Sequence, residues 1–152
     1  SDSFDLHSSF SYWIMRLANA MQEDFNACLE AHGVTWTQWM ALNVLHLGKA
    51  DTPAKIADLI GVDRSAVTRL LDRLADKDLI ERHHDGLDRR SVKILLTTKA
   101  GEIVVALDAA VKAHQARYLA SLPGTEVRGL KGNLQKMLKV ADVDSQALWK
   151  HN

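Results

Sequence analysis

Apolar residues recur every three or four positions over long segments at both ends of the chain. In the segment of about 8–31 they fall on one helical face, at Phe10, Ile14, Leu17, Met21, Phe25 and Leu29. Segments of about 98–120 and 125–140 show the same spacing, which predicts amphipathic helices. A helix over about 35–48, beginning at Thr35, is apolar on more than one side and is expected to be largely buried.

Two shorter helices are predicted in the middle of the chain. Thr52 and Pro53 open the first, as a capping residue and a proline at the first helical position. Asp63 caps the second, which is predicted to run to about Lys77. Because only the turn 61–63 separates them, the pair has the sequence form of a helix-turn-helix.

The pattern after these helices is that of a β-hairpin, with strands over 79–84 and 91–96. A hairpin directly after a helix-turn-helix is a wing. The predicted fold class is therefore mainly α with a small β-hairpin wing, in a single domain of residues 1–152. A winged helix-turn-helix core of about 35–97 is flanked by helices of about 8–31 and 98–142. The simplest way for these flanking helices to bury their apolar faces is to pack against a second copy of the chain, so we expect a homodimer.

Composition narrows the class of protein. The chain has 152 residues, of which 47% are hydrophobic and 25% charged, and 19 basic residues balance 19 acidic ones. No apolar run is long enough for a membrane span. The absence of a secretory signal and the single cysteine, Cys28, favour a cytoplasmic protein without a disulfide framework. No stretch supplies a nucleophile with a base or paired carboxylates, so we expect neither an enzyme nor a cofactor.

The helix that Asp63 caps has two chemically different faces. Its inward face is apolar, with Ala66, Val67, Leu70, Leu71 and Leu74. Its outward face carries short hydroxyls and long cations suited to the major groove of DNA, namely Arg64, Ser65, Thr68, Arg69 and Arg73. For this helix alone a solvated face, with arginines paired to Asp72 and Asp76, would be the simpler interpretation. The helix-turn-helix before it and the wing after it favour DNA recognition.

The tip of the wing is a second candidate DNA contact. Arg89 and Arg90 are placed there, beside Asp88, which is expected to hold one of them. An arginine on a thin projection can enter the minor groove, where the negative potential is deepest. The alternative is an ordinary charged turn. From position 64 to 93 eight basic residues face six acidic ones, so the positive footprint is focused rather than broad.

At these residues the chain resembles the MarR/SlyA family of bacterial regulators. The resemblance rests on the stretch 56–74 (IADLIGVDRSAVTRLLDRL), on Leu-Ile-Glu-Arg at 79–82, and on Asp-Arg-Arg at 88–90 followed by Leu96-Thr97. It extends over essentially the whole chain. It implies a triangular homodimer that binds pseudo-palindromic double-stranded DNA operators, usually as a repressor. Two turns depart from the family pattern, with Asp78 in place of a glycine and Gly101 one position late, after Ala100.

The same resemblance implies a small aromatic carboxylate ligand, since many relatives release DNA when such an acid binds. The candidate residues are Tyr12, Trp13, Arg16, Trp36, Trp39, Asn43 and His46. Arg16 is the expected anchor, because a cation on a mainly apolar helix needs an anionic partner. An acidic residue across the dimer would serve equally well, and the tryptophans also suit a core role.

Three other interpretations carry less weight. Cys28 would suit an oxidant-sensing regulator, but its place near the apolar stripe favours burial. His83, His84 and Asp85 do not make a metal site, because adjacent strand residues point to opposite faces. A winged helix can also serve only as a protein–protein interaction module, and salt-dependent duplex binding would separate that function from DNA regulation.

Overall fold

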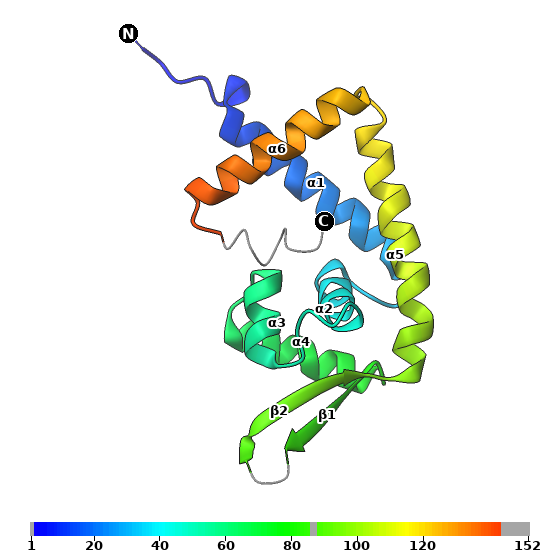
Figure 1. Ribbon diagram of the computed structural model, residues 1–152. Coiled ribbons are helices and arrows are strands. Elements are labelled where there is room, and N and C mark those ends of the chain that lie inside the picture. Colours follow the sequence, from blue (N-terminus) through cyan, green and yellow to red (C-terminus); the bar gives the residue numbers. More distant parts are fainter. Residues whose placement is uncertain (1, 86–87, 144–152) are drawn as a thin grey trace.

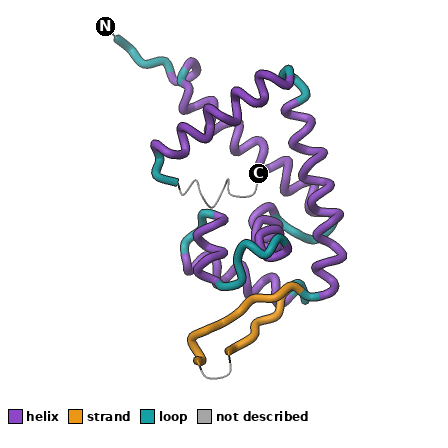
Figure 2. The backbone as a smooth tube through the Cα atoms, viewed as in Figure 1, coloured by secondary structure: helices purple, strands orange, loops and turns teal. Residues whose placement is uncertain are grey.

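The computed structural model of the chain describes residues 2–85 and 88–143; the side chains of 85 and 88–91 lie outside that description. Its elements follow one another in the predicted order. They are a 3-10 turn (Leu6–Ser8), α1 (Phe10–Glu30), α2 (Trp36–His46), α3 (Pro53–Ile60), α4 (Arg64–Asp76), β1 (Ile80–Asp85), β2 (Asp88–Leu96), α5 (Thr98–Leu119) and α6 (Gly124–Val140). In the described part of the chain, Figure 2 shows helices joined by loops, together with one β-hairpin. The predicted fold class, mainly α with a hairpin wing, is confirmed.

The ends of the short helices are set by the residues that the sequence indicates. Thr52 caps α3 and Asp63 caps α4, each through its side chain. Gly61 ends α3 with a φ of +75°, a left-handed conformation that glycine adopts without the steric cost of a Cβ. Asp78 also has a positive φ, +60°, at the turn where the family resemblance predicts glycine. The departure from the family pattern therefore leaves the turn geometry in place.

The wing is longer than predicted on its returning strand. β2 begins at Asp88 instead of about 91, because antiparallel pairing continues as far as Asp85 opposite Asp88, with an irregularity after His84. The expectation that Arg89 and Arg90 belong to the turn is thus wrong for their backbone, which lies in β2. At the base of the hairpin the Ile94 amide donates to the Asp51 carbonyl, N to O 2.7 Å, which fixes the sheet to the segment before α3.

The core lies in the winged part of the chain and beneath the first half of α5. Its largest fully buried side chains are Leu29, Leu42, Ile56, Leu71, Leu74, Ile94, Leu107, Val67 and Val104. α2 is less buried than predicted. Gln38, Ala41 and Leu42 are inside, but Trp36 and Trp39 are half-buried and Leu47 is exposed, because α2 is covered mainly by α3 and α5.

The terminal helices leave apolar surface uncovered. In Figure 1, α6 and the first half of α1 lie beyond the winged part of the chain. The long helix α5 runs from the hairpin to α6. No residue of α6 is buried. The exposed apolar side chains are Phe10, Trp13, Ile14, Met15 and Leu17 on α1, and Leu130, Leu134, Met137 and Val140 on α6. None of the described helices combines the length and apolar character that a membrane crossing needs.

A cluster of polar side chains joins α1 to α5. The Asp24 carboxylate accepts hydrogen bonds from the Tyr118 hydroxyl and from Arg117, the latter at 2.9 Å. The Tyr118 hydrogen bond and the Arg117 charge lower the pKa of Asp24 below its ordinary value of 3.8, and the bond to Asp24 raises the pKa of Tyr118. Buried His114 lies with its Nε2 3.7 Å from the same carboxylate, and its ring packs 4.1 Å from that of Phe25.

Candidate nucleic-acid interface

The predicted division of faces on α4 is present in the structure. Val67, Leu70, Leu71 and Leu74 are buried in the core, whereas Arg64, Ser65, Thr68, Arg69 and Arg73 are exposed. The core contacts fix the rotation of the helix about its axis, so the polar residues form a continuous outer face. A helix presented in this way, after a short helix and a tight turn, can enter a major groove.

The start of α4 is organised by its capping residue. Asp63 Oδ1 accepts from the Ala66 amide and from the Ser65 hydroxyl, both at 2.7 Å. The hydrogen bonds from Ser65 and then from Ala66 lower the pKa of Asp63 below its ordinary value of 3.8. The cap is therefore an ionised carboxylate at neutral pH, next to the positive end of the helix dipole.

Two further exposed side chains of α4, Thr68 and Asp72, have hydrogen-bond partners within the protein. The Thr68 hydroxyl donates to the Arg64 carbonyl one turn earlier, at 3.0 Å. Asp72 Oδ1 accepts from Arg82 of β1 at 2.6 Å. The ion pair of Asp72 thus connects α4 to the wing, and among the described ion pairs none joins Asp72 or Asp76 to Arg69 or Arg73.

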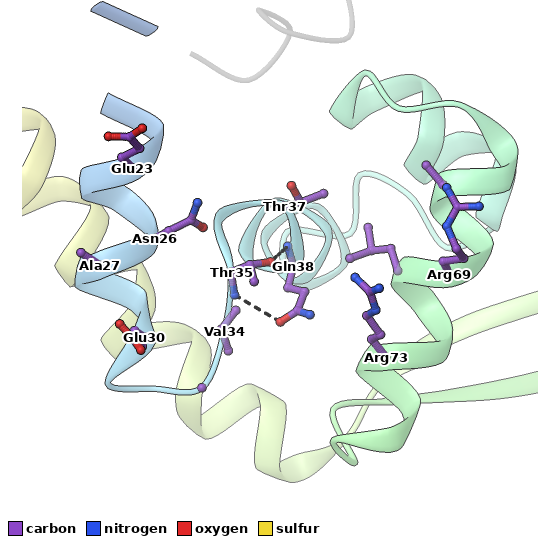
Figure 3. Close-up of a pocket in the computed structure, with 13 residues that line it drawn as sticks. Glu23, Asn26, Ala27, Glu30, Val34, Thr35, Thr37, Gln38, Arg69 and Arg73 are labelled. Atoms are coloured by element: carbon purple, nitrogen blue, oxygen red, sulfur yellow. Dashed lines mark hydrogen bonds between the residues drawn. The ribbon is translucent and has the colours of Figure 1, made fainter. Parts of the chain in front are cut away.

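An open groove of about 820 Å³ separates α4 from α1 and the start of α2. Figure 3 shows Arg69 and Arg73 on its α4 wall and Glu23 and Glu30 on its α1 wall. On the other flank of α4, a depression of about 420 Å³ is lined by Thr52, Pro53, Ala54, Arg64, Val67, Thr68, Val92 and Lys93. Arg69 and Arg73 therefore flank one side of the outer face, and Arg64 and Thr68 flank the other.

The wing carries the second group of predicted DNA contacts. Asp88, Arg89 and Arg90 begin β2, and their side chains lie outside the described part. His83 and His84 are exposed on β1, and the His83 Nε2 lies 3.1 Å from a Glu81 carboxylate oxygen. Among the described residues no group of three or more metal-binding side chains is present.

The candidate ligand residues on α1 lie on the exposed half of that helix. Arg16 is exposed, with its guanidinium carbon 5.9 Å from the centroid of the Tyr12 ring. The Trp13 indole N–H donates to the His7 carbonyl at 2.7 Å. Within one chain Arg16 is therefore solvated and not buried among apolar side chains.

The candidates on α2 form a separate group. The rings of Phe25, Trp36 and Trp39 stack in sequence, with centroid separations of 4.3 Å and 4.9 Å. Trp39 Nε1 and Asn43 Nδ2 both donate to Asp108 of α5, at 2.9 Å and 3.3 Å. These polar atoms already have partners, so they fasten α2 to α5. His46 is exposed at the end of α2 and lines a different depression.

The expectation that Cys28 is buried is wrong. Cys28 is exposed in the described structure. Phe25 and Leu29 turn toward the core, whereas Cys28, three residues after Phe25, lies on a part of α1 that no described residue covers.

Comparison with known proteins agrees with this geometry. The model of the MarR family matches residues 32–91, from the end of α1 to the wing. The solved complex of MepR from S. aureus with DNA is 28% identical, with a TM-score of 0.81 over 87% of this chain and 98% of that chain. Residues 32–91 are thus similar to the MarR family in sequence, and nearly the whole chain is similar to it in fold. A cysteine-to-serine mutant of MarR from E. coli, solved with operator DNA, is 27% identical, with a TM-score of 0.80 over 91% of this chain and 99% of that one.

The chain accordingly has the winged-helix fold of MarR-family transcriptional regulators. The fold is also that of CouR from Rhodococcus jostii RHA1, solved with p-coumaroyl-CoA, at a TM-score of 0.77 over 89% of this chain and 95% of that one. At 21% identity, that likeness concerns the fold alone.

The structure brings together four features that were not predicted from the sequence: the Asp63–Ser65 bond, the Asp72–Arg82 pair, the anchoring of Trp39 by Asp108, and the acidic α1 wall. The first could have been found, because a capping aspartate can reach a hydroxyl two residues on. The two side-chain pairs join different elements, and no local pattern marks them. Glu23 and Glu30 are seven residues apart on α1, but only the packing of α1 beside α4 makes them line the groove.

Proposed function

We propose that the chain is a homodimeric repressor that presents two copies of α4 to a pseudo-palindromic DNA operator. Residues 1–152 then form one domain, in which about 35–97 bind DNA and about 8–31 and 98–142 hold the dimer. The observation that carries the dimer is the uncovered apolar surface of α6 and of the first half of α1. Association with a second chain would remove this apolar surface from water, which favours the dimer.

The outer face of α4 is proposed to lie in the major groove. Ser65, Thr68 and Arg69 would reach base edges near the start and middle of the helix, and Arg64 and Arg73 would reach bases or phosphates from its flanks. The wing would place Arg90, assisted by Arg89 and Asp88, in the adjacent minor groove. Support comes from the exposure of the α4 side chains and from the DNA-bound relatives.

We further propose that a small aromatic carboxylate weakens operator binding. Its carboxylate would pair with Arg16, and its ring would lie against Tyr12 and Trp13. The separate group on α2, made of Trp36, Trp39, Asn43 and His46, would reach this ligand in the dimer. Support comes from the chemistry of these side chains and from CouR, a protein of similar fold that was solved with p-coumaroyl-CoA. A ligand that favours the DNA-free state by roughly 3 kcal/mol would weaken operator binding about a hundredfold.

The DNA-binding proposal is tested by mapping the DNA that the protein protects upstream of its own gene, and by measuring affinity for that DNA over a range of salt concentrations. A protected pseudo-palindrome bound by a dimer, with affinity falling steeply as salt rises, is the expected result. If the protein binds no duplex, its winged helix serves protein contacts instead.

The ligand proposal is tested separately, with benzoates, salicylates and hydroxycinnamates as probes. Operator release and tryptophan fluorescence are followed in the wild type and in Arg16→Ala. Release from the wild type alone supports Arg16 as the anchor. Equal release from both proteins removes Arg16 from that role.

A further inference from the structure

The two hydroxyl side chains on the outer face of α4 share one property: their hydrogen-bond donors are already used inside the protein. The Ser65 hydroxyl donates to Asp63 at 2.7 Å, and the Thr68 hydroxyl donates to the Arg64 carbonyl at 3.0 Å. Asp72 has no donor when ionised, and only one of its oxygens receives Arg82. What these three exposed residues offer to an approaching molecule is therefore acceptor lone pairs, together with the Thr68 methyl group.

These acceptors lie along one strip of the helix. Ser65 and Thr68 are three residues apart, and Asp72 is four residues further, which is the spacing of neighbours on one helical face. Arg69 and Arg73, whose side chains carry only donors, follow the adjacent strip, on the flank toward the α1 groove (Figure 3). The outer face thus presents a strip of acceptors beside a strip of donors.

We propose that the acceptor strip makes α4 select base pairs that present an amino group, cytosine N4 or adenine N6, on the strand facing Ser65 and Thr68. This inference rests on the proposed function and specifies the DNA sequences that it concerns. In the major groove cytosine offers a donor, while guanine offers two acceptors; adenine offers one of each, and thymine an acceptor and a methyl group. If guanine or thymine lay opposite the strip, the side-chain acceptors would lie against a base oxygen that is also an acceptor. No hydrogen bond could form there, so these bases are disfavoured opposite the strip.

The neighbouring donor strip reinforces this selection. A G·C pair places the guanine acceptors next to the cytosine amino group across the groove. Arg69 or Arg73 can approach the guanine while an acceptor of the strip approaches the cytosine of the same or the next pair. The two strips together therefore favour G·C pairs in one orientation, which adds a strand preference to the base preference.

Asp63 is the positioning residue of this arrangement. Its carboxylate stays ionised, because the hydrogen bonds from Ser65 and Ala66 lower its pKa. An ionised carboxylate can only accept a hydrogen bond from the Ser65 hydroxyl and has no proton to donate, so the direction of the hydrogen bond is fixed. Without Asp63 the Ser65 hydroxyl could rotate and donate to guanine or thymine as readily as it accepts from cytosine or adenine.

The test begins with selection of binding sequences from a random duplex library by the wild type. Each base pair of the enriched duplex is then substituted, and affinity is measured at one salt concentration for wild type, Ser65→Ala and Thr68→Val. We expect each variant to lose the preference for an amino-bearing base at one position of each half-site. Affinity for the enriched duplex should fall about threefold to tenfold, the size of one net hydrogen bond.

Base analogues identify the group that is read. Purine in place of adenine, or 2-pyrimidinone in place of cytosine, removes only the amino group. Each replacement should weaken duplex binding by the wild type about threefold to tenfold. At the base pair that Ser65 contacts, the replacement should leave duplex binding by the Ser65→Ala variant unchanged. Asp76→Asn is the matched control, since it removes an exposed carboxylate from the same helix one turn beyond Asp72. It should strengthen binding to all duplexes and change no base preference.

Asp63→Thr separates positioning from stability. Threonine can still cap α4 but is too short to hold the Ser65 proton in the same way. We expect a Tm close to that of the wild type and a loss of discrimination between amino- and oxygen-bearing bases at the Ser65 position. Base preferences unchanged in Ser65→Ala, Thr68→Val and Asp63→Thr would overturn this inference and leave the DNA-binding proposal standing. If the wild type enriches no sequence at all, the proposed function itself is wrong.

Discussion

Arg82 of β1 and Asp72 of α4 are joined by a hydrogen bond of 2.6 Å, which fastens the root of the wing to the helix beside it. The side chains are 33% and 58% exposed, so the pair contributes only about 0–1 kcal/mol to folding. Its larger consequence is electrostatic. Asp72 lies on the outer face of α4, where an unpaired carboxylate would repel the phosphates of DNA.

Arg82→Gln should therefore weaken binding to every duplex, with a Tm shift of no more than about 1–3 °C. Asp72→Asn in the Arg82→Gln background should restore much of the affinity, because it removes the charge that Arg82 had neutralised. A double-mutant cycle on duplex affinity measures this coupling. Additive effects would show that Arg82 contacts DNA by itself.

Arg69→Ala tests whether α4 reads sequence. Losing one good bidentate contact to a base should reduce discrimination between operator and random DNA by about 1–3 kcal/mol. Arg128→Ala, which removes an exposed arginine from α6, is the control and should leave the ratio unchanged. An equal loss on both kinds of DNA would make Arg69 a phosphate contact.

Arg90→Ala tests the wing. Its removal should lower operator affinity, with a smaller effect for Arg89→Ala, while the dimer and its Tm stay as in the wild type. Competition binding against the wild type, with dimerisation checked by light scattering, measures both properties. Affinity equal to that of the wild type would end the minor-groove assignment.

Leu134→Glu tests the assembly. Leu134 is 37% exposed on α6, in line with Leu130 and Met137, and a buried glutamate in a dimer interface would carry a large desolvation cost. The variant should be monomeric at micromolar concentration and lose operator binding. Leu47→Glu, at a 55% exposed apolar position just after α2 and outside the segments proposed to hold the dimer, is the control and should remain dimeric. A monomeric Leu134→Glu protein that still binds the operator as tightly as the wild type would contradict the proposed role of the dimer.

The Asp24 cluster predicts how stability changes with pH. Since folding lowers the pKa of Asp24 below 3.8, its charge stabilises the folded state at neutral pH, and that contribution is lost as the pH falls through the lowered pKa. Asp24→Asn keeps an acceptor for Tyr118 but has no charge. Its deficit in unfolding free energy should be constant from about pH 7 to pH 5 and disappear in more acidic solution. A deficit that persists unchanged at about pH 2 would show that the charge of Asp24 is not responsible.

The sequence by itself determined most of the fold, because the relevant signals are local. Caps at Thr52 and Asp63, the break at Gly61 and the apolar periodicity of each helix depend on neighbours within one or two turns. They predicted the order of the elements and the buried face of α4. The extent of β2 was missed, since pairing between Asp85 and Asp88 depends on the opposite strand.

Only the tertiary structure decided which polar groups remain available for binding. Trp39 and Asn43 looked like free ligand contacts until Asp108, from a distant helix, occupied their donors. Asp72 looked like a partner for the arginines of its own helix, yet Arg82 reaches it from the wing. Burial of Cys28 was wrongly predicted because periodicity defines an apolar face but not which part of it another element covers. Hydrogen bonds and coverage of this kind depend on distances between segments far apart in sequence, and those distances are set only when the helices pack.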